Sequence, residues 1–183
     1  MKKPLIFDND CLSSFLWIKR IDILISLFQG EIIVPETVNF ELSKMKKSRY
    51  RFVYDDLEEK IQDNSFVVAE IPATSVMAQE YSSLIDMTNP KKIGRGEAAA
   101  IVLAKNLNGT LASNNLKDIL PHIKNDVPPY TCTDEILYLY FKNGAISIDE
   151  GKKIWREMKS FGRKLPIYDF DAVVYKFENN IKR

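Results

Sequence analysis

The fold of this chain is decided by a short apolar stretch near its start, which reads PLIFD at residues 4–8. Large apolar residues followed directly by an acid are typical of a buried strand in a parallel sheet, which would deliver Asp8 at its carboxyl end. Apolar residues then recur at helical spacing over residues 15–28. The stretch EIIVP at 31–35 predicts a second strand, and a second helix should run from there to residue 45. The first 45 residues therefore predict a strand, helix, strand and helix in succession.

The alternation of strands and helices continues along the chain. We expect Ser13 or Ser14 to cap the first helix and Gly30 to end it. The remaining expected elements are strands at 66–71 and 109–113 and helices at 51–63, 74–87, 97–107 and 116–122. This order predicts an α/β fold, a three-layer α/β/α arrangement around a mostly parallel sheet. Its functional groups should gather beyond the carboxyl ends of the strands.

The sequence changes character after Pro128-Pro129. Two helices are expected, at 133–142 and 148–161, and Ser147 with Glu150 forms a capping box for the second. We therefore expect a core at 1–130 and a C-terminal helical extension at 131–183, packed together as one compact domain. Near the end, the paired acids of Asp169-Phe170-Asp171 suit the start of a further helix.

Composition excludes several classes of protein. The 26 Lys and Arg residues against 25 Asp and Glu give a net charge of +1, which rules out a globally basic nucleic-acid coat but not a local patch. The two cysteines form no C-x-x-C motif, so a reducing, cytoplasmic compartment is expected, and no stretch predicts a membrane span. With a single histidine, Ser-His-Asp or Cys-His catalysis is disfavoured. If the protein is an enzyme, carboxylates should carry its chemistry.

Four acids lie where such a sheet concentrates chemistry, namely Asp8, Glu41, Glu97 and Asp118. Two carboxylates about 4 Å apart repel by about 4 kcal/mol at an effective dielectric constant of about 20, so a cation is needed to offset the repulsion. All-oxygen ligation favours Mg²⁺ or Mn²⁺ over zinc, and such a metal suits water activation for phosphodiester hydrolysis. The other interpretation is that each acid is an ordinary surface residue or helix N-terminal charge, which is the simpler account of Glu97 taken alone.

Several ordered stretches together resemble the PIN domain family. They are LIFDND at 5–10 with Ser13, VPETV at 34–38 leading to Glu41, and GRGEAAAIVLA at 94–104. The stretch ASNNLKD at 112–118 resembles the last acidic motif of that family, in which Ser or Thr and Asn precede an Asp. The resemblance covers residues 4 to about 120 in the order and spacing of the family.

The resemblance implies an Mg²⁺- or Mn²⁺-dependent endoribonuclease, a hydrolase of RNA phosphodiester bonds, with the fold of many toxins of bacterial toxin–antitoxin pairs. It implies partners of three kinds: single-stranded or structured RNA, an antitoxin protein and a second copy of the chain. Some members of the family carry Asp where this chain has Asn114 or Asn115, so this chain would have lost a metal ligand if it belongs to that branch. The alternative function is therefore a degenerate module that binds RNA or protein without cleavage. The implied site has Asp8, Glu41, Glu97 and Asp118 as catalytic acids, Asp8, Asp118 and Glu97 as metal-binding residues, and Ser113 and Asn115 in support.

A cluster of basic residues follows the second predicted helix. It admits two interpretations, an RNA-guiding surface or a solvated loop without a partner. Lys91, Lys92 and Arg95 pose the same choice before Glu97. The clustered residues are Lys44, Lys46, Lys47, Arg49 and Arg51.

The triplet at residues 8–10, DND, also invites comparison with haloacid-dehalogenase-like phosphatases, which use an Asp nucleophile after a strand. That family requires Gly-Thr after the second Asp, whereas Cys11-Leu12 follow here, and its later Gly-Asp motif is missing. The nuclease interpretation is therefore preferred.

Overall fold

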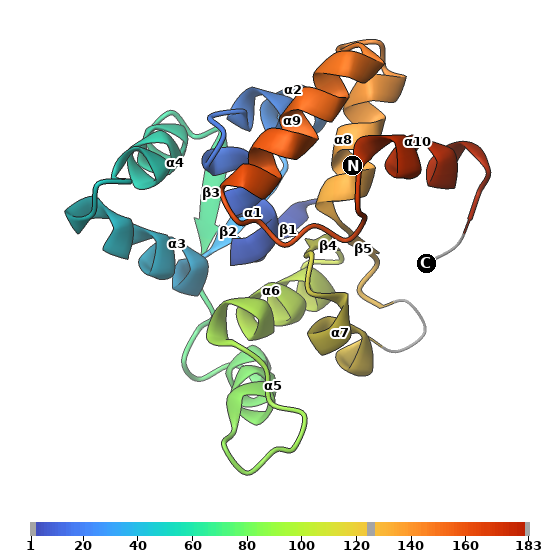
Figure 1. Ribbon diagram of the computed structural model, residues 1–183. Helices are drawn as coiled ribbons and strands as arrows, with labels where there is room; N and C mark the ends of the chain where they lie inside the picture. Colours follow the sequence, from blue (N-terminus) through green and yellow to red (C-terminus); the bar gives the residue numbers. More distant parts are fainter. Residues whose placement is uncertain (1–2, 124–126, 182–183) are drawn as a thin grey trace.

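A five-stranded sheet organises the computed structural model, which describes residues 3–123 and 127–181 (Figure 1). Its strand order is β3-β2-β1-β4-β5, and all four pairings in the described chain are parallel. In the middle of the sheet, Ile6 of β1 is in register with Ile33 on one side and Leu111 on the other. The strands are β1 (Leu5–Phe7), β2 (Ile32–Pro35), β3 (Phe66–Ala69), β4 (Thr110–Ala112) and β5 (Tyr130–Thr131).

Helices cover both faces of the sheet, as the sequence predicted. Figure 1 shows α1, α2, α4, α8, α9 and α10 on one side and α5, α6 and α7 on the other. The helices are α1 (Asn9–Leu16), α2 (Ile21–Phe28), α3 (Glu36–Ser43), α4 (Phe52–Gln62), α5 (Val76–Ile85), α6 (Arg95–Asn106), α7 (Leu116–Ile119), α8 (Thr133–Lys142), α9 (Ile148–Ser160) and α10 (Phe170–Glu178), with short 3₁₀ turns η1 (Lys44–Lys47) and η2 (Leu120–His122).

Alternation along β1 divides the core into two layers. Leu5 and Phe7 pack into a large cluster with helices of one face, whereas Ile6 packs with Ile101 and Leu111 on the other. Successive side chains of a strand point to opposite faces, so an apolar run buries both layers at once. The three-layer α/β/α prediction is thereby confirmed.

The helix expected at 15–28 is in fact two helices, α1 and α2. The chain turns between them at Lys19, whose φ of 55° lies in the left-handed region, and no glycine marks this break in the sequence. Neither predicted serine caps α1, because Ser13 and Ser14 are buried inside it. Asp8 is the cap instead, and its Oδ1 accepts from the Cys11 amide at 2.8 Å. Since helix α1 begins immediately after β1, the first acid of the site is also a helix N-cap.

The strand β5 was not predicted. It consists of Tyr130 and Thr131, which pair with Leu111 and Ala112 of β4. Two residues are too few to show any periodicity. The chain that follows carries Ile136 of α8 into the same buried cluster as the strands, so residues on both sides of position 130 build one core.

The extension after β5 packs tightly where α9 crosses α10. A Cβ at Gly151 of α9 would collide with the ring of Phe170, which is fully buried at the start of α10. Asp169 caps α10 as expected, since its Oδ1 accepts from the Ala172 amide at 2.8 Å. In residues 3–123 and 127–181, no helix combines the length and apolar character needed to cross a bilayer.

We expect Gly151→Ala to lower the free energy of unfolding by about 1–3 kcal/mol, because the added methyl group overpacks the contact with Phe170. Helix propensity alone predicts the opposite effect, an increase of about 0.5–1 kcal/mol in the free energy of unfolding, because Ala is more stable than Gly inside a helix. Urea unfolding decides between the two. The double variant Gly151→Ala with Phe170→Leu should recover part of the lost stability. A single variant as stable as the parent would show that the Phe170 ring can move to accommodate the added methyl group.

Candidate active site

Three of the four predicted acids line one small cavity at the carboxyl edge of the sheet. Asp8 ends β1, Glu41 lies on α3 after β2, and Glu97 lies in the first turn of α6. They surround a cavity of about 170 Å³ whose other lining residues are Asn9, Asp10, Gly94 and Gly96. Because the strands are parallel, their carboxyl ends share one edge, and this edge brings together residues that are far apart in sequence.

The fourth acid, Asp118, lines an adjoining cavity of about 280 Å³. Asp10 lines both cavities and so marks their junction. The remaining residues of the second cavity are Asn114, Asn115, Lys117 and Lys164. The predicted quartet is therefore distributed over two neighbouring cavities.

Asp8 is the most unusual of these acids because it is only 1% exposed. Its Oδ1 accepts from the Cys11 amide, whereas its Oδ2 is buried without a hydrogen-bond partner. Burial raises the pKa of Asp8 from 3.8 to about 7, although the nearby Ser113 hydroxyl and the Cys11 amide act in the opposite direction. The negative charges of Asp10 and Glu97 add to the upward shift of this pKa. A nearby cation would stabilise the ionised form.

Glu41 is held by a short chain of polar contacts from α1. The Asn9 Nδ2 donates to Glu41 Oε2 at 3.0 Å, and the Ser13 hydroxyl donates to Asn9 Oδ1 at 2.7 Å. On the other side, a Cβ at Gly96 would lie 3.3 Å from Glu41 Oε2 and 3.2 Å from Val38. The missing side chain at Gly96 thus lets α6 approach the carboxylate closely.

One side-chain amide connects Glu97 with Asp118. The Asn115 Nδ2 donates to Glu97 Oε1 at 2.6 Å and to Asp118 Oδ2 at 2.8 Å. The other oxygen of Glu97 accepts from the Gly94 amide at 3.0 Å, as a helix-capping contact. Buried Ser113 accepts from the Asn115 amide at 3.2 Å through its hydroxyl. Both residues predicted in support therefore lie among the acids.

Asn114 has a different position from Asn115. Its Oδ1 accepts from the Thr133 amide at 3.0 Å, and its Nδ2 donates to Ser14 Oγ at 3.3 Å. These contacts tie the start of α8 to α1. Asn114 therefore links secondary-structure elements, whereas Asn115 contacts the acids directly.

The site includes residues that the sequence analysis did not assign to it. Asn9 and Asp10 are the main examples, and the spacing of Asp8 and Asp10 on either side of a helix start could have revealed the second acid. Lys164, which lines the cavity of Asp118, gave no signal, because it comes from the segment after α9. Only the tertiary structure places it there.

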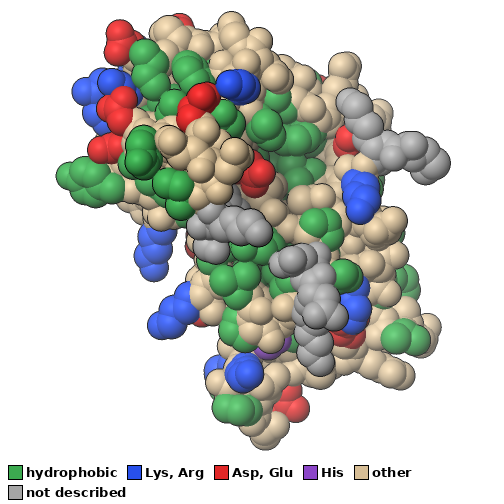
Figure 2. Space-filling view, turned by 90° about the vertical axis from the view of Figure 1, so that its right-hand side faces the viewer, with side chains coloured by type: hydrophobic (Ala, Val, Ile, Leu, Met, Phe, Trp, Pro, Cys, Tyr) green, Lys and Arg blue, Asp and Glu red, His purple; other side chains and the backbone are tan. Residues whose placement is uncertain are grey.

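Two of the five clustered basic residues are engaged in ion pairs with acidic side chains. Lys46 pairs with Glu58 at 2.9 Å, and Arg51 pairs with Asp55 at 3.0 Å. Arg49 lies over the ring of Tyr50, and Lys47 is exposed. Lys44 lies over the ring of exposed Phe40. It also lines a cavity of about 300 Å³ together with Glu41 and Arg95. Lys44 is thus the member of the cluster that shares a cavity with a site acid. Figure 2 views the opposite side of the molecule, away from α3 and α4, and acidic and basic side chains are interspersed on that face.

The chemistry of the donor set fits a hard divalent cation. Its oxygens come from carboxylates and amides, the ligands that Mg²⁺ and Mn²⁺ prefer, and Oδ2 of Asp8 is buried without a hydrogen-bond partner in the described structure. Within that part of the chain, however, no three His, Cys, Asp or Glu side chains already stand in a metal-binding arrangement. The carboxylates would therefore have to move closer around an ion.

The parallel sheet between two layers of helices, with acids gathered at its carboxyl edge, defines the class of the protein. It is an α/β/α domain whose functional site lies beyond the carboxyl ends of its strands. Within this class, the chain belongs to the PIN domain family, since the family model DUF3368, described as a PIN domain, matches residues 4–118. The family is a nuclease-type family. The solved structure of PAE2754 from Pyrobaculum aerophilum is similar in fold, with a TM-score of 0.50 and 10% identity over 80% of this chain and 100% of that chain. No curated protein matches the sequence.

Proposed function

We propose that this protein is an Mg²⁺- or Mn²⁺-dependent endoribonuclease. The observation that carries the proposal is buried Asp8, whose Oδ2 has no partner and whose neighbours include Asp10 and Glu97. An unpaired buried carboxylate is costly, so its presence at a strand end favours a functional role over a structural one. Membership of a nuclease-type family supports the same conclusion.

In the proposed mechanism, Asp8, Asp118 and Glu97 would hold the metal. A divalent cation in such a site stabilises negative charge on the scissile phosphate and lowers the pKa of a bound water. Asn115 holds Glu97 and Asp118 on either side of one amide nitrogen, which limits their mutual repulsion. Asn9 orients Glu41 through Oε2, which leaves Oε1 to accept a hydrogen bond from the attacking water.

The biological setting that we propose follows from the family. The protein would act on RNA in the cytoplasm as the toxin of a toxin–antitoxin pair, with an antitoxin protein as its partner and a homodimer as its assembly. A neighbouring reading frame that encodes a small, charged, DNA-binding protein would support this role. An isolated gene would instead favour a nuclease without an antitoxin.

One observation favours a second function, that of a degenerate module that binds RNA or protein without cleavage. Both oxygens of Glu97 already accept hydrogen bonds, one from Asn115 and one from the Gly94 amide. A carboxylate engaged in this way has less capacity for a metal. The two functions differ in whether bound RNA is cut.

We expect the purified protein to cleave an end-labelled single-stranded RNA in Mg²⁺ or Mn²⁺. EDTA should stop the reaction, and excess Mn²⁺ should restore it, because the carboxylates alone cannot offset charge on the phosphate. EDTA already saturated with Mg²⁺ is the control for effects of the chelator itself. RNA binding without cleavage in both metals would favour the degenerate module. Neither binding nor cleavage of RNA would contradict the ribonuclease and the RNA-binding form of the degenerate module.

A further inference from the structure

We infer that the segment between α9 and α10, residues 161–169, forms a substrate-facing wall of the acid site, where Lys164 together with Lys117 of α7 binds a phosphate of the RNA strand beside the cleaved bond. The inference rests on the proposed ribonuclease function and deepens it. It assigns a role to part of the C-terminal extension, which lies outside the matched residues 4–118.

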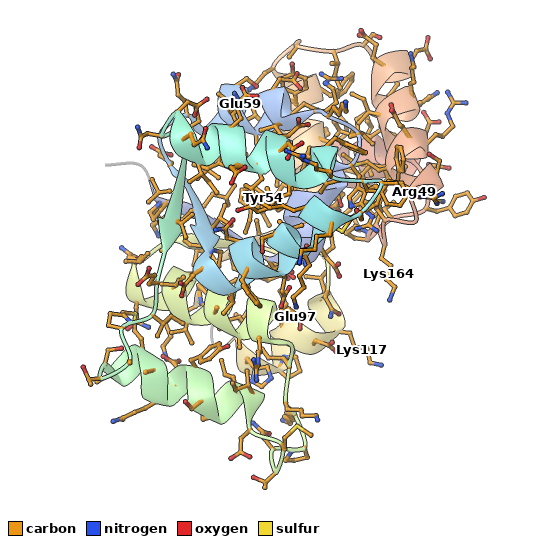
Figure 3. The ribbon with its side chains drawn as sticks, turned by 90° about the vertical axis from the view of Figure 1, so that its left-hand side faces the viewer. Arg49, Tyr54, Glu59, Glu97, Lys117 and Lys164 are labelled. Carbon is orange, nitrogen blue, oxygen red and sulfur yellow. The ribbon has the colours of Figure 1, made fainter. Side chains whose placement is uncertain are left out.

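The two lysines border the same opening from different parts of the chain. Lys117 comes from α7 directly after β4, and Lys164 comes from the segment after α9. Both line the cavity of about 280 Å³ that holds Asp118, and Asp10 joins this cavity to the one around Asp8. Figure 3 shows Lys164 reaching down and Lys117 reaching outward on the same side of Glu97. An RNA strand lying over the acids would therefore pass between the ammonium groups of Lys117 and Lys164.

The charges of these lysines are available to a ligand. Both side chains are exposed, and within the described residues neither forms an ion pair or a side-chain hydrogen bond. Lys46 and Arg51, by contrast, are paired with Glu58 and Asp55. An RNA backbone that approaches a group of carboxylates is repelled, and two ammonium groups at the rim reduce that repulsion.

The polypeptide around Lys164 is anchored at both ends. Helix α9 ends at Ser160, and Gly162, with a φ of +72°, turns the chain after it. The Arg163 amide donates to the Met158 carbonyl at 3.2 Å. The half-buried Arg163 guanidinium lies 5.1 Å from the ring centroid of Trp17, at the C-terminal end of α1. At the far end, the Lys159 Nζ donates to the Tyr168 carbonyl at 3.0 Å.

These anchors give Lys164 a defined starting point. Between them, Leu165 and Ile167 pack against the large core cluster, so the segment is attached to the domain on its inner side. A cation held in place before the ligand arrives loses less conformational entropy on binding than one on an unanchored loop. Lysine acts as a point charge that binds phosphate without a fixed geometry, which suits a substrate of varied sequence.

The test compares cleavage of a labelled single-stranded RNA in Mn²⁺ by the parent, Lys117→Ala, Lys164→Ala and the double variant at several salt concentrations. We expect each single change to raise KM about 3–10-fold and the double change about 10–50-fold, with kcat within about 2-fold. The slope of log KM against log salt should fall by about 0.7 for each lysine removed. Lys153→Ala is the matched control, since Lys153 is exposed on α9 and lines neither cavity.

The outcomes separate the inference from the function on which it rests. If the parent cleaves RNA and the double variant keeps the parental KM and salt slope, the inference fails alone. A fall in kcat with unchanged KM would also overturn it, because the lysines would then not be binding phosphate. If the parent neither binds nor cleaves RNA, the proposed function fails and the inference fails with it. Unchanged melting temperatures would show that the variants fold, as expected for exposed side chains.

Discussion

Asp8→Asn is expected to reduce RNA cleavage by a factor of about 10²–10³ or more and, at the same time, to stabilise the metal-free protein at neutral pH. The loss of activity follows because the variant replaces the orphaned buried oxygen, which we propose as a metal ligand, with an uncharged group. Single-turnover cleavage in saturating Mn²⁺ measures this effect. Parental cleavage rates in the variant would remove Asp8 from the mechanism.

The gain in stability follows from the sign of the pKa shift. Burial raises the pKa of Asp8 to about 7 in the folded protein, above its ordinary value of 3.8 in the unfolded chain. Well below pH 3.8 both states are protonated and the folded state bears no penalty. As the pH rises to about 7, the unfolded chain ionises first, so the free energy of unfolding falls with pH. Asn carries no charge at any pH, and the variant avoids this loss.

Urea unfolding in EDTA at several pH values measures the difference between parent and Asp8→Asn. The variant should be more stable by about 1–3 kcal/mol at pH 7.5, and this difference should shrink toward pH 4. Added Mn²⁺ should stabilise the parent but not the variant. Asp10→Asn is the control, because Asp10 is exposed and its replacement should alter stability by less than about 1 kcal/mol. A pH-independent difference would show that burial of Asp8 carries no titration cost.

Lys176→Met should lower the free energy of unfolding by about 3–5 kcal/mol. The Lys176 Nζ lies 2.8 Å from Asp134 Oδ2, and the two side chains are 14% and 0% exposed. Removal of the lysine takes away the positive charge 2.8 Å from a carboxylate that is buried where α8 meets α10. Met keeps most of the apolar stem, so the measured loss reports the charge rather than the packing.

The same pair of helices supplies a matched control. Lys142 of α8 pairs with Glu178 of α10 at 3.1 Å, but these side chains are 59% and 45% exposed. Lys142→Met should therefore cost about 0–1 kcal/mol, because water screens the exposed pair. Adding Asp134→Asn to Lys176→Met should recover part of the stability. Equal losses in the two lysine variants would show that burial of Asp134 does not decide the effect.

Much of the fold could be predicted because the relevant signals are local. Strands β1 to β4 are short apolar runs, and most helices show an apolar period or a capping residue. The break at Lys19 could not be predicted, since a lysine in a left-handed conformation has no sequence signature of its own. Strand β5 was missed because its two residues are defined only by their pairing with β4.

The candidate site also contains residues that the sequence predicted and residues that it did not. Asp8, Glu41 and Glu97 were selected because parallel strands and their helices direct residues to one edge, and the structure places these three around one cavity. Asp118 lies in the adjoining cavity, and no local pattern indicated that Lys164 would join it there. The position of Lys164 depends on how the C-terminal helices pack against the sheet, which local sequence patterns do not specify.

The contact of Asn115 with two carboxylates has an evolutionary consequence. Its amide nitrogen occupies the space between Glu97 and Asp118 with a donor that belongs to the protein itself. The codons for Asn and Asp differ by a single base, so one transition would replace this donor with a third negative charge. Position 115 can therefore change, over short evolutionary distances, between two states. With Asn, the amide of the protein itself neutralises part of the repulsion between Glu97 and Asp118. With Asp, three carboxylates would lie together, and only a cation from solution could offset their charge.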